Sequence, residues 1–170
     1  MHLVIVSGRS GAGKSSVLGV LEDMNFYCID NLPAAMLEEA VTTLFSVSPG
    51  RNLAVSIDIR TLGQPTDVPE LVASLKPKVS RLDVVFMDAS DESLGRRFSE
   101  TRRLHPLSTG LEGSHLSEAF KNEHLRLEPI RVCSNLKIDS SELSIHALRQ
   151  QIREFASGQV ATKLILKLQS

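Results

Sequence analysis

The sequence has 170 residues, of which 42% are hydrophobic and 23% are charged, and its formal net charge is -1. This profile is typical of one ordinary soluble globular domain, and a chain of this length folds without disulfides or a structural metal. The nearly balanced charge argues against attraction of the whole molecule to nucleic acid, and no run of 18 apolar residues is present to span a bilayer.

The cysteines and histidines lack the spacing of known metal sites. Cys28 and Cys133 form no CxxC pair, and the five histidines form no HxH or HExxH pattern. These residues therefore predict a protein of the reducing cytoplasm whose cysteines pack in the core. Magnesium carried by a bound ligand remains compatible with the sequence.

Short apolar runs alternate with stretches of helical periodicity or charge along the chain. The predicted strands cover residues 3–6, 26–29, 53–59, 82–87 and 136–138. The predicted helices cover residues 14–24, 33–45, 68–79, 91–104 and 144–156. This alternation predicts an α/β domain, a doubly wound parallel sheet with helices on both faces.

Two segments depart from the alternation. Residues 104–113 are rich in turn formers and follow an arginine cluster, which predicts a surface loop that could serve as a lid. Residues 160–168 alternate apolar and polar side chains as a strand does, yet no partner strand follows. We therefore expect one domain over residues 1–158 and, over residues 159–170, the start of a second domain whose remainder is missing from this chain.

Eight residues between the first predicted strand and the first predicted helix match the phosphate-binding pattern GxxxxGK[ST]. They are Gly8, Arg9, Ser10, Gly11, Ala12, Gly13, Lys14 and Ser15. In such a P-loop the backbone N–H groups and the helix N-terminus surround a phosphate group. Lys14 is expected to reach the β- and γ-phosphates as a catalytic residue, and Ser15 to bind Mg²⁺. The alternative is a glycine-rich turn without a ligand.

A P-loop site also needs a carboxylate for magnesium, and Asp30, Asp58 and Asp88 each end an apolar strand. Asp58 is favoured as metal ligand and catalytic residue, because Arg60 two positions later offers a cation for phosphate. Asp88 remains the alternative, and its other role would be to begin the turn into the next helix.

Four arginines precede the predicted lid: Arg96, Arg97, Arg102 and Arg103. They fit an anion clamp around phosphate and a solvated helix face equally well. Asp30 and Asn31, at the end of the second strand, fit either a ligand contact or a helix N-cap. His105 is expected to be a loop residue rather than a catalytic base.

Four motifs occur in order: VSGRSGAGKS, FYCIDNLP, SIDIR and ETRRLHPLS. Together they make nearly the whole chain resemble the RapZ/YvcJ family of bacterial P-loop proteins. The resemblance implies a kinase-like N-terminal domain that binds ATP and GTP, with the P-loop as the ATP site. It also implies that the segment associated with GTP comprises Asp58, Ile59, Arg60 and Thr61.

In the best-known members of that family, the protein is an adapter that presents small regulatory RNAs to an endoribonuclease and so controls amino-sugar synthesis. The resemblance implies that RNA binding belongs chiefly to a C-terminal domain missing from this chain, and that the full-length protein is a homo-oligomer. The chain is also similar to nucleoside monophosphate kinases, whose lid arginines would match Arg96, Arg97, Arg102 and Arg103.

Three hypotheses follow. The first is a regulatory domain that binds ATP or GTP with Mg²⁺ and is a weak ATPase or GTPase at most. The second is a small-molecule or nucleoside monophosphate kinase whose acceptor binds near Asp30. The third, direct RNA binding by the arginine face, is disfavoured because the single tyrosine and the absence of an aromatic-basic motif leave little to stack on bases.

Overall fold

The computed structural model describes residues 1–63, 68–102, 104–108 and 114–158, with side chains from residue 116 onward in the last range. One parallel sheet has the strand order β2-β3-β1-β4-β5. The strands are β1 (His2–Gly8), β2 (Tyr27–Ile29), β3 (Leu53–Ser56), β4 (Arg81–Asp88) and β5 (Leu136–Asp139). The α-helices are α1 (Lys14–Asp23), α2 (Leu37–Val47), α3 (Val68–Leu75), α4 (Asp91–Thr101), α5 (Ser114–Cys133) and α6 (Ile145–Ala156). The described residues also form the short 3₁₀ helices η1 (Ala34–Met36) and η3 (Lys76–Lys78).

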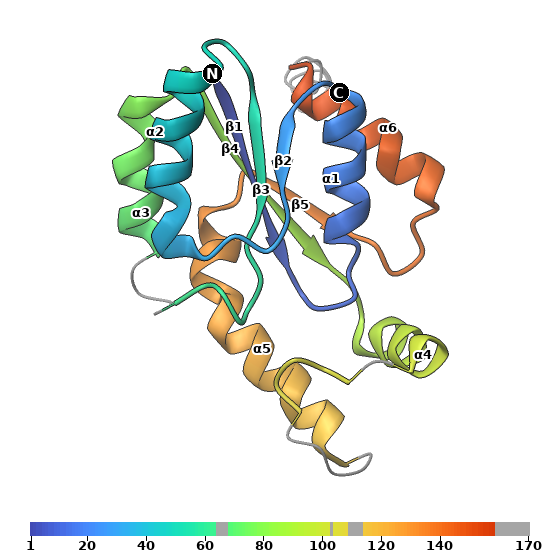
Figure 1. Ribbon diagram of the computed structural model, residues 1–170. Coiled ribbons are helices and arrows are strands. Elements are labelled where there is room, and N and C mark those ends of the chain that lie inside the picture. Colours follow the sequence, from blue (N-terminus) through green and yellow to red (C-terminus); the bar gives the residue numbers. More distant parts are fainter. Residues whose placement is uncertain (64–67, 103, 109–113, 159–170) are drawn as a thin grey trace, which may run out of the picture.

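The central strand β1 is buried on both faces because its successive apolar side chains point to opposite sides of the sheet. Leu3 and Ile5 enter a core formed with α2, α3 and part of α5. Val4 and Val6 enter a second core formed with α1 and α6. Figure 1 shows these two helical layers on either side of the sheet, with α4 lying beyond the carboxyl ends of the strands. The predicted α/β fold with a doubly wound parallel sheet is therefore confirmed.

Several predicted element ends are wrong. The strand predicted over residues 53–59 ends at Ser56, although Ile57 and Ile59 beyond it are buried. The helix predicted from residue 33 begins as the 3₁₀ turn η1, for which Pro33 is the N-cap. The helix predicted over residues 68–79 becomes the 3₁₀ helix η3 at residues 76–78, where Pro77 lacks the N–H that an α-helix would use. The helix predicted to residue 104 ends at Thr101, because Arg102 is left-handed with a φ of 50°.

The 20-residue helix α5 is absent from the elements predicted above. It crosses beneath one face of the sheet and continues past the carboxyl ends of the strands (Figure 1). Phe120, Leu127 and Ile130 are its buried apolar contacts with the two cores. Glu123 projects from the same helix and is completely buried.

The expected second domain, together with the strand pattern at 160–168, falls outside the described residues and stays a prediction. Cys28 and Cys133 are free thiols. Cys28 packs against the core that α1 and α6 share, and burial raises the pKa of its thiol to about 11. Among the described helices, none has both the length and the apolar character that crossing a membrane requires.

A buried carboxylate secures the amino end of β4. Asp83 is 5% exposed and accepts hydrogen bonds from Asn135 Nδ2 (2.6 Å) and from His2 Nε2 (2.7 Å). The Arg81 guanidinium lies 2.7 Å from the same carboxylate. Burial opposes ionisation, but these partners outweigh it and hold the pKa of Asp83 below its ordinary value of 3.8. Asp83 therefore joins β1, β4 and the start of β5 at the edge opposite α4.

Replacing Asp83 with Asn should destabilise the protein in a pH-dependent manner. A carboxyl group whose pKa is depressed by folding stabilises the protein above the unfolded-state pKa, and this contribution is lost as pH falls through the folded-state pKa. At pH 7 we expect Asp83→Asn to lower the free energy of unfolding by roughly 1–3 kcal/mol, since a buried partner is lost. Urea unfolding should show that the difference in the free energy of unfolding between Asp83→Asn and wild type becomes smaller below about pH 4. A difference that stays constant to pH 3 would show that Asp83 is not an ionised partner in the folded protein.

Candidate nucleotide-binding site

A cleft with a volume of about 520 Å³ opens at the carboxyl edge of the sheet. In an open α/β sheet this edge is where ligands bind. One wall is the P-loop, another is the segment that follows β2 and β3, and α4 with the residues after it forms the third. The lining residues are Ser10, Gly11, Lys14, Ser15, Asp30, Asn31, Ser56, Asp58, Arg60, Arg97, Phe98, Thr101, Leu104 and Pro106.

The P-loop turns directly into α1, as its sequence predicts. Gly13, the residue before the helix, has a φ of 104°, a conformation that favours glycine. Nζ of Lys14 donates to the carbonyl oxygens of Gly8 (2.9 Å) and Arg9 (3.1 Å), which holds it at the mouth of the loop. Burial lowers the pKa of Lys14, against the opposing effect of nearby carboxylates such as Glu123 and Asp58. Both of these hydrogen bonds from Nζ are to neutral carbonyl oxygens, so a phosphate group in the loop would give the Lys14 ammonium a direct anionic partner.

Asp58 is an anchored, ionised carboxylate in the second wall. Its Oδ1 accepts from the backbone N–H of Arg60 (2.8 Å), and its Oδ2 accepts from the Arg60 guanidinium (2.9 and 2.5 Å). With its amide nitrogen turned toward Asp58, Asn31 donates to both carboxylate oxygens (3.3 and 3.2 Å). Burial opposes ionisation, but the hydrogen bonds from Arg60 outweigh it and hold the pKa of Asp58 below its ordinary value.

A second carboxylate lies in the same wall. Ser56 Oγ donates to Asp30 Oδ1 and accepts from the backbone N–H of Asn31 (2.8 Å). Asn31 has a φ of 58°, a left-handed conformation that this bond and the Asp58 contact stabilise. Neither Asp30 nor Asn31 caps a helix, since η1 has Pro33 as its N-cap and no side-chain cap. The two residues therefore belong to the cleft.

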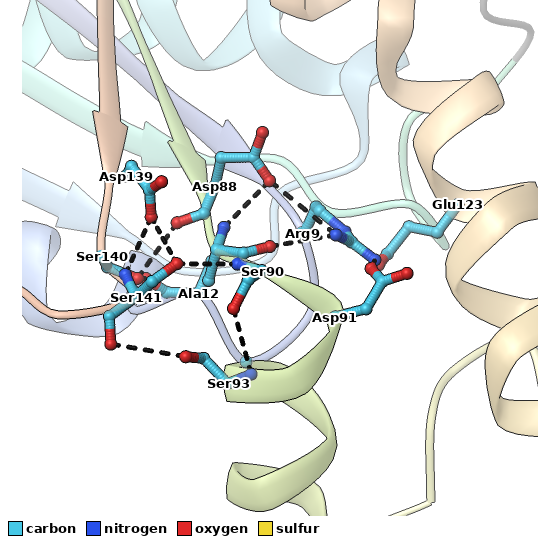
Figure 2. A network of polar contacts seen from close by, with 12 residues as sticks. Arg9, Ala12, Asp88, Ser90, Asp91, Ser93, Glu123, Asp139, Ser140 and Ser141 are labelled. Carbon is cyan, nitrogen blue, oxygen red and sulfur yellow. Dashed lines mark hydrogen bonds and ion pairs between the residues drawn. The ribbon is translucent and has the colours of Figure 1, made fainter.

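Of the three strand-end carboxylates considered for magnesium, Asp30 and Asp58 line this cleft and Asp88 does not. Asp58 lines it, whereas Asp88 accepts from the backbone N–H of Ala89 (2.9 Å) and lies 4.0 Å from Arg9, outside the lining (Figure 2). A serine hydroxyl and an ionised carboxylate are oxygen donors of the type that magnesium prefers, usually together with water and substrate phosphates. Ser15 and Asp58, which share the cleft, therefore fit this ion.

Comparison with known proteins identifies the family. The family model described as "RapZ-like N-terminal domain" matches residues 1–160. The chain belongs to this family. "Nucleotide-binding protein IL0393" of Idiomarina loihiensis is 45% identical over 172 residues, covering 100% of this chain and 59% of that protein. A "Nucleotide-binding protein" of Hahella chejuensis is 44% identical over 173 residues, again 100% of this chain and 60% of that protein. The RapZ-like chain thus spans about three fifths of the length of these relatives.

Solved kinases share the fold of this RapZ-like domain. A shikimate kinase from Bacteroides thetaiotaomicron aligns with a TM-score of 0.63 and 17% identity, covering 92% of this chain and 98% of that one. A gluconokinase from Sinorhizobium meliloti aligns with a TM-score of 0.57 and 19% identity, covering 99% and 97% of the two chains. At these identities the likeness establishes a P-loop kinase-like fold and nothing about the substrate.

The arginines before the predicted lid have different environments in the RapZ-like domain. Arg97 lines the cleft and donates to the carbonyl oxygens of Gly11 (3.0 Å) and Ser140 (2.6 Å), so it ties α4 to the P-loop. Ser140 completes this link by donating to the carbonyl oxygen of Ala12 (2.8 Å), as Figure 2 shows. Arg96 and Arg102 are exposed and line no part of the cleft, which favours the solvated-face interpretation for these two. Arg103 lies outside the described residues.

Other predicted site residues occupy supporting positions. The Arg9 guanidinium points away from the cleft, donates to the Ala89 carbonyl (3.0 Å) and pairs with Asp91 (2.6 Å). Ile59 is buried in the core, so its side chain cannot contact a ligand. Thr61 Oγ1 accepts from the backbone N–H of Asp58 (3.2 Å) and thereby shapes the segment that presents the carboxylate.

Sequence reasoning missed two groups near the cleft. The sequence predicts Ser56 only as part of a strand, although the strand ends there and its hydroxyl faces Asp30. Glu123 lies on α5, which is absent from the predicted helices. The helical spacing of Phe120, Leu127 and Ile130 was the available signal, and it would have placed Glu123 near the buried face of a helix.

Proposed function

We propose that this RapZ-like domain binds ATP or GTP together with Mg²⁺ in the P-loop cleft, hydrolyses the nucleotide slowly at most, and regulates an attached protein region. The observation that carries the proposal is the convergence of Lys14, Ser15 and Asp58 on one open cleft. The P-loop N–H groups and Lys14 would bind the phosphates, and Ser15 and Asp58 would hold the metal ion. Residues 58–61 would be the segment associated with GTP, as the family resemblance implies.

For the whole protein we propose the role that the family resemblance implies. It would bind small regulatory RNA, present that RNA to an endoribonuclease and control amino-sugar synthesis as a homo-oligomer in the cytoplasm. The printed names of the relatives support nucleotide binding, and their greater length supports a further region on which the bound nucleotide would act. The predicted contribution of Arg103 to nucleotide binding belongs to this proposal as well, whereas Arg102 is exposed outside the cleft lining and would contribute only its charge.

Product analysis tests the regulatory role directly. The domain is incubated with Mg²⁺ and ATP or GTP, with and without a mixture of nucleoside monophosphates and small hydroxylated acceptors. Binding without turnover, or slow hydrolysis independent of any acceptor, supports the regulatory domain. Fast ADP formation that requires an acceptor, with the phosphate recovered on that acceptor, contradicts it.

The second candidate function is phosphoryl transfer to a small acceptor. The observation favouring it is the pair Asp30 and Ser56, which lies in the cleft wall formed by the segments after β2 and β3. A carboxylate in that position could accept a proton from an acceptor hydroxyl group. In this case Asp30→Asn should abolish acceptor-dependent ADP formation while leaving nucleotide affinity within about twofold.

The dependence of ATP affinity on Mg²⁺ should show whether Asp58 or Asp88 binds the metal ion. We expect Asp58→Asn to weaken binding of ATP in the presence of Mg²⁺ by about tenfold, because a metal ligand loses its charge, and to leave binding without Mg²⁺ nearly unchanged. Asp88→Asn is the matched control and should alter neither affinity. Calorimetric titration with and without Mg²⁺ measures both. If the magnesium-dependent loss occurs in Asp88→Asn instead, the metal assignment moves to β4.

A further inference from the structure

A fully buried carboxylate joins two walls of the cleft. Glu123 of α5 is 0% exposed. Its Oε1 accepts from the backbone N–H of Ser10 (2.9 Å) and from the Ser10 hydroxyl (2.5 Å), so it holds the P-loop from behind. Its Oε2 lies 3.1 Å from Nε2 of His105. Burial opposes ionisation, but the hydrogen bonds from His105 and Ser10 outweigh it and hold the pKa of Glu123 below its ordinary value.

His105 anchors the described segment that follows α4, residues 104–108, which we call the His105 loop. The residue is 2% exposed, and its ring packs against Phe98 and Phe120, with ring centroids 5.4 and 5.3 Å away. Its Nδ1 accepts from the backbone N–H of Leu107 (3.1 Å). An imidazole nitrogen that accepts carries no proton, so this arrangement assigns the proton to Nε2, which donates to Glu123.

The His105 loop is also part of the cleft. Leu104 and Pro106, on either side of the buried histidine, both line it, and Ser10 lines it from the P-loop. One carboxylate therefore holds the two walls with different oxygen atoms. If either wall moved away, a buried charge would lose a hydrogen bond, and this penalty links the positions of the two walls.

Arg9 supplies a further partner to the same carboxylate. Its buried Nε has no hydrogen-bond partner among the described residues and lies 3.9 Å from Glu123 Oε2 (Figure 2). The Arg9 guanidinium also lies over the Phe120 ring, 5.1 Å from its centroid, and pairs with Asp91 (2.6 Å). At 3.9 Å this Nε makes no hydrogen bond to the carboxylate, so it adds positive charge beside Oε2 without replacing the hydrogen bond from His105.

We propose that Glu123 is a positioning residue that couples the P-loop to the His105 loop, so that a nucleotide bound at the P-loop and the ordered His105 loop stabilise each other. This inference rests on the proposed nucleotide binding. Coupling of this kind is reciprocal: a nucleotide that orders the loop binds more weakly when the loop cannot be ordered.

The test replaces Glu123 with Gln in the 170-residue chain. The amide keeps one acceptor oxygen, but its NH₂ group cannot accept from the other wall. Calorimetry measures MgATP affinity, and amide hydrogen exchange is followed at Ser108, whose N–H donates to the His105 carbonyl oxygen (2.9 Å). In wild type we expect saturating MgATP to slow this exchange. In Glu123→Gln we expect about tenfold weaker binding and no slowing at saturation, as coupling energies of this class predict.

Asp83→Asn is the matched control, because it disrupts another buried carboxylate–histidine contact (2.7 Å) at the opposite edge of the sheet. It should lower stability but leave the MgATP affinity and the protection of Ser108 unchanged. Equal losses in Asp83→Asn would attribute the effect to general destabilisation and overturn the proposal. If Glu123→Gln does not fold, His105→Phe removes the donor while filling the same volume, and it should also abolish the nucleotide-dependent slowing.

Two further outcomes separate this inference from the proposed function. Wild-type protein that fails to bind MgATP or MgGTP would overturn the proposed nucleotide binding and the coupling with it. Wild-type protein that binds, accompanied by a Glu123→Gln variant with unchanged affinity and unchanged slowing at Ser108, would overturn the coupling alone.

Discussion

Replacing Lys14 with Ala should weaken MgATP and MgGTP binding by roughly 100-fold or more, which corresponds to about 2.7 kcal/mol. The ammonium group lies at the mouth of the P-loop, where its hydrogen bonds within the described part of the chain go to the Gly8 and Arg9 carbonyl oxygens. Because burial lowers the pKa of Lys14, its charge is not well compensated without a ligand. Its removal should therefore leave the unliganded protein about as stable as wild type. Calorimetric titration and thermal unfolding, each with and without nucleotide, measure both effects.

Lys78→Ala provides the matched control for this result. Lys78 pairs with Glu38 on the surface, outside the cleft lining, so its loss should leave nucleotide affinity unchanged. A Lys14→Ala variant that binds MgATP as tightly as wild type would remove the P-loop from the proposed site. A variant that no longer folds would instead show that Lys14 has a structural role.

Local motifs predict the P-loop residues that line the centre of the candidate site. The P-loop is eight consecutive residues between a buried strand and a helix, so its geometry follows from chain order alone. The position of Asp58 follows from the sheet, because β3 pairs with β1 and brings its carboxyl end beside the P-loop. Asp88 follows β4, the other neighbour of β1, and only side-chain contacts distinguish the two carboxylates.

The contacts that sequence could not supply join distant positions. Ser10 and Glu123 are 113 positions apart, and no periodicity relates a P-loop residue to a helix that was not predicted. Helix α5 contains Pro129, whose missing N–H is unfavourable in a helix interior. The helix also carries many charged residues, which obscure its apolar periodicity. The strand predicted over residues 53–59 is too long for another reason. Ile57 and Ile59 are buried although they lie beyond the strand, so the apolar alternation correctly indicated burial but not pairing with a neighbouring strand.

Replacing Gly8 with Ala should severely destabilise the fold, independently of any effect on a ligand. Gly8 has a φ of 137°, and a Cβ atom there would lie 2.0 Å from the carbonyl oxygen and 2.6 Å from the nitrogen of Met87. Both are backbone atoms of the neighbouring strand β4 and cannot move aside as a flexible side chain could. Overpacking and the unfavourable φ together should cost about 3–5 kcal/mol, a large part of a typical domain's stability. Urea unfolding followed by circular dichroism measures the loss.

Gly19→Ala tests whether this loss is specific to the position of Gly8. Gly19 lies within α1, and nothing lies within 4 Å of the Cβ position there, so alanine should raise stability by about 0.5–1 kcal/mol through its better helix propensity. A Gly8→Ala variant with the wild-type urea midpoint would contradict the close approach of β1 to β4. If Gly8→Ala fails to fold while Lys14→Ala folds without binding nucleotide, the two residues of one motif have separate roles. Gly8 would then allow the chain to pass from β1 into the P-loop beside β4, and Lys14 would bind the phosphate groups of the nucleotide.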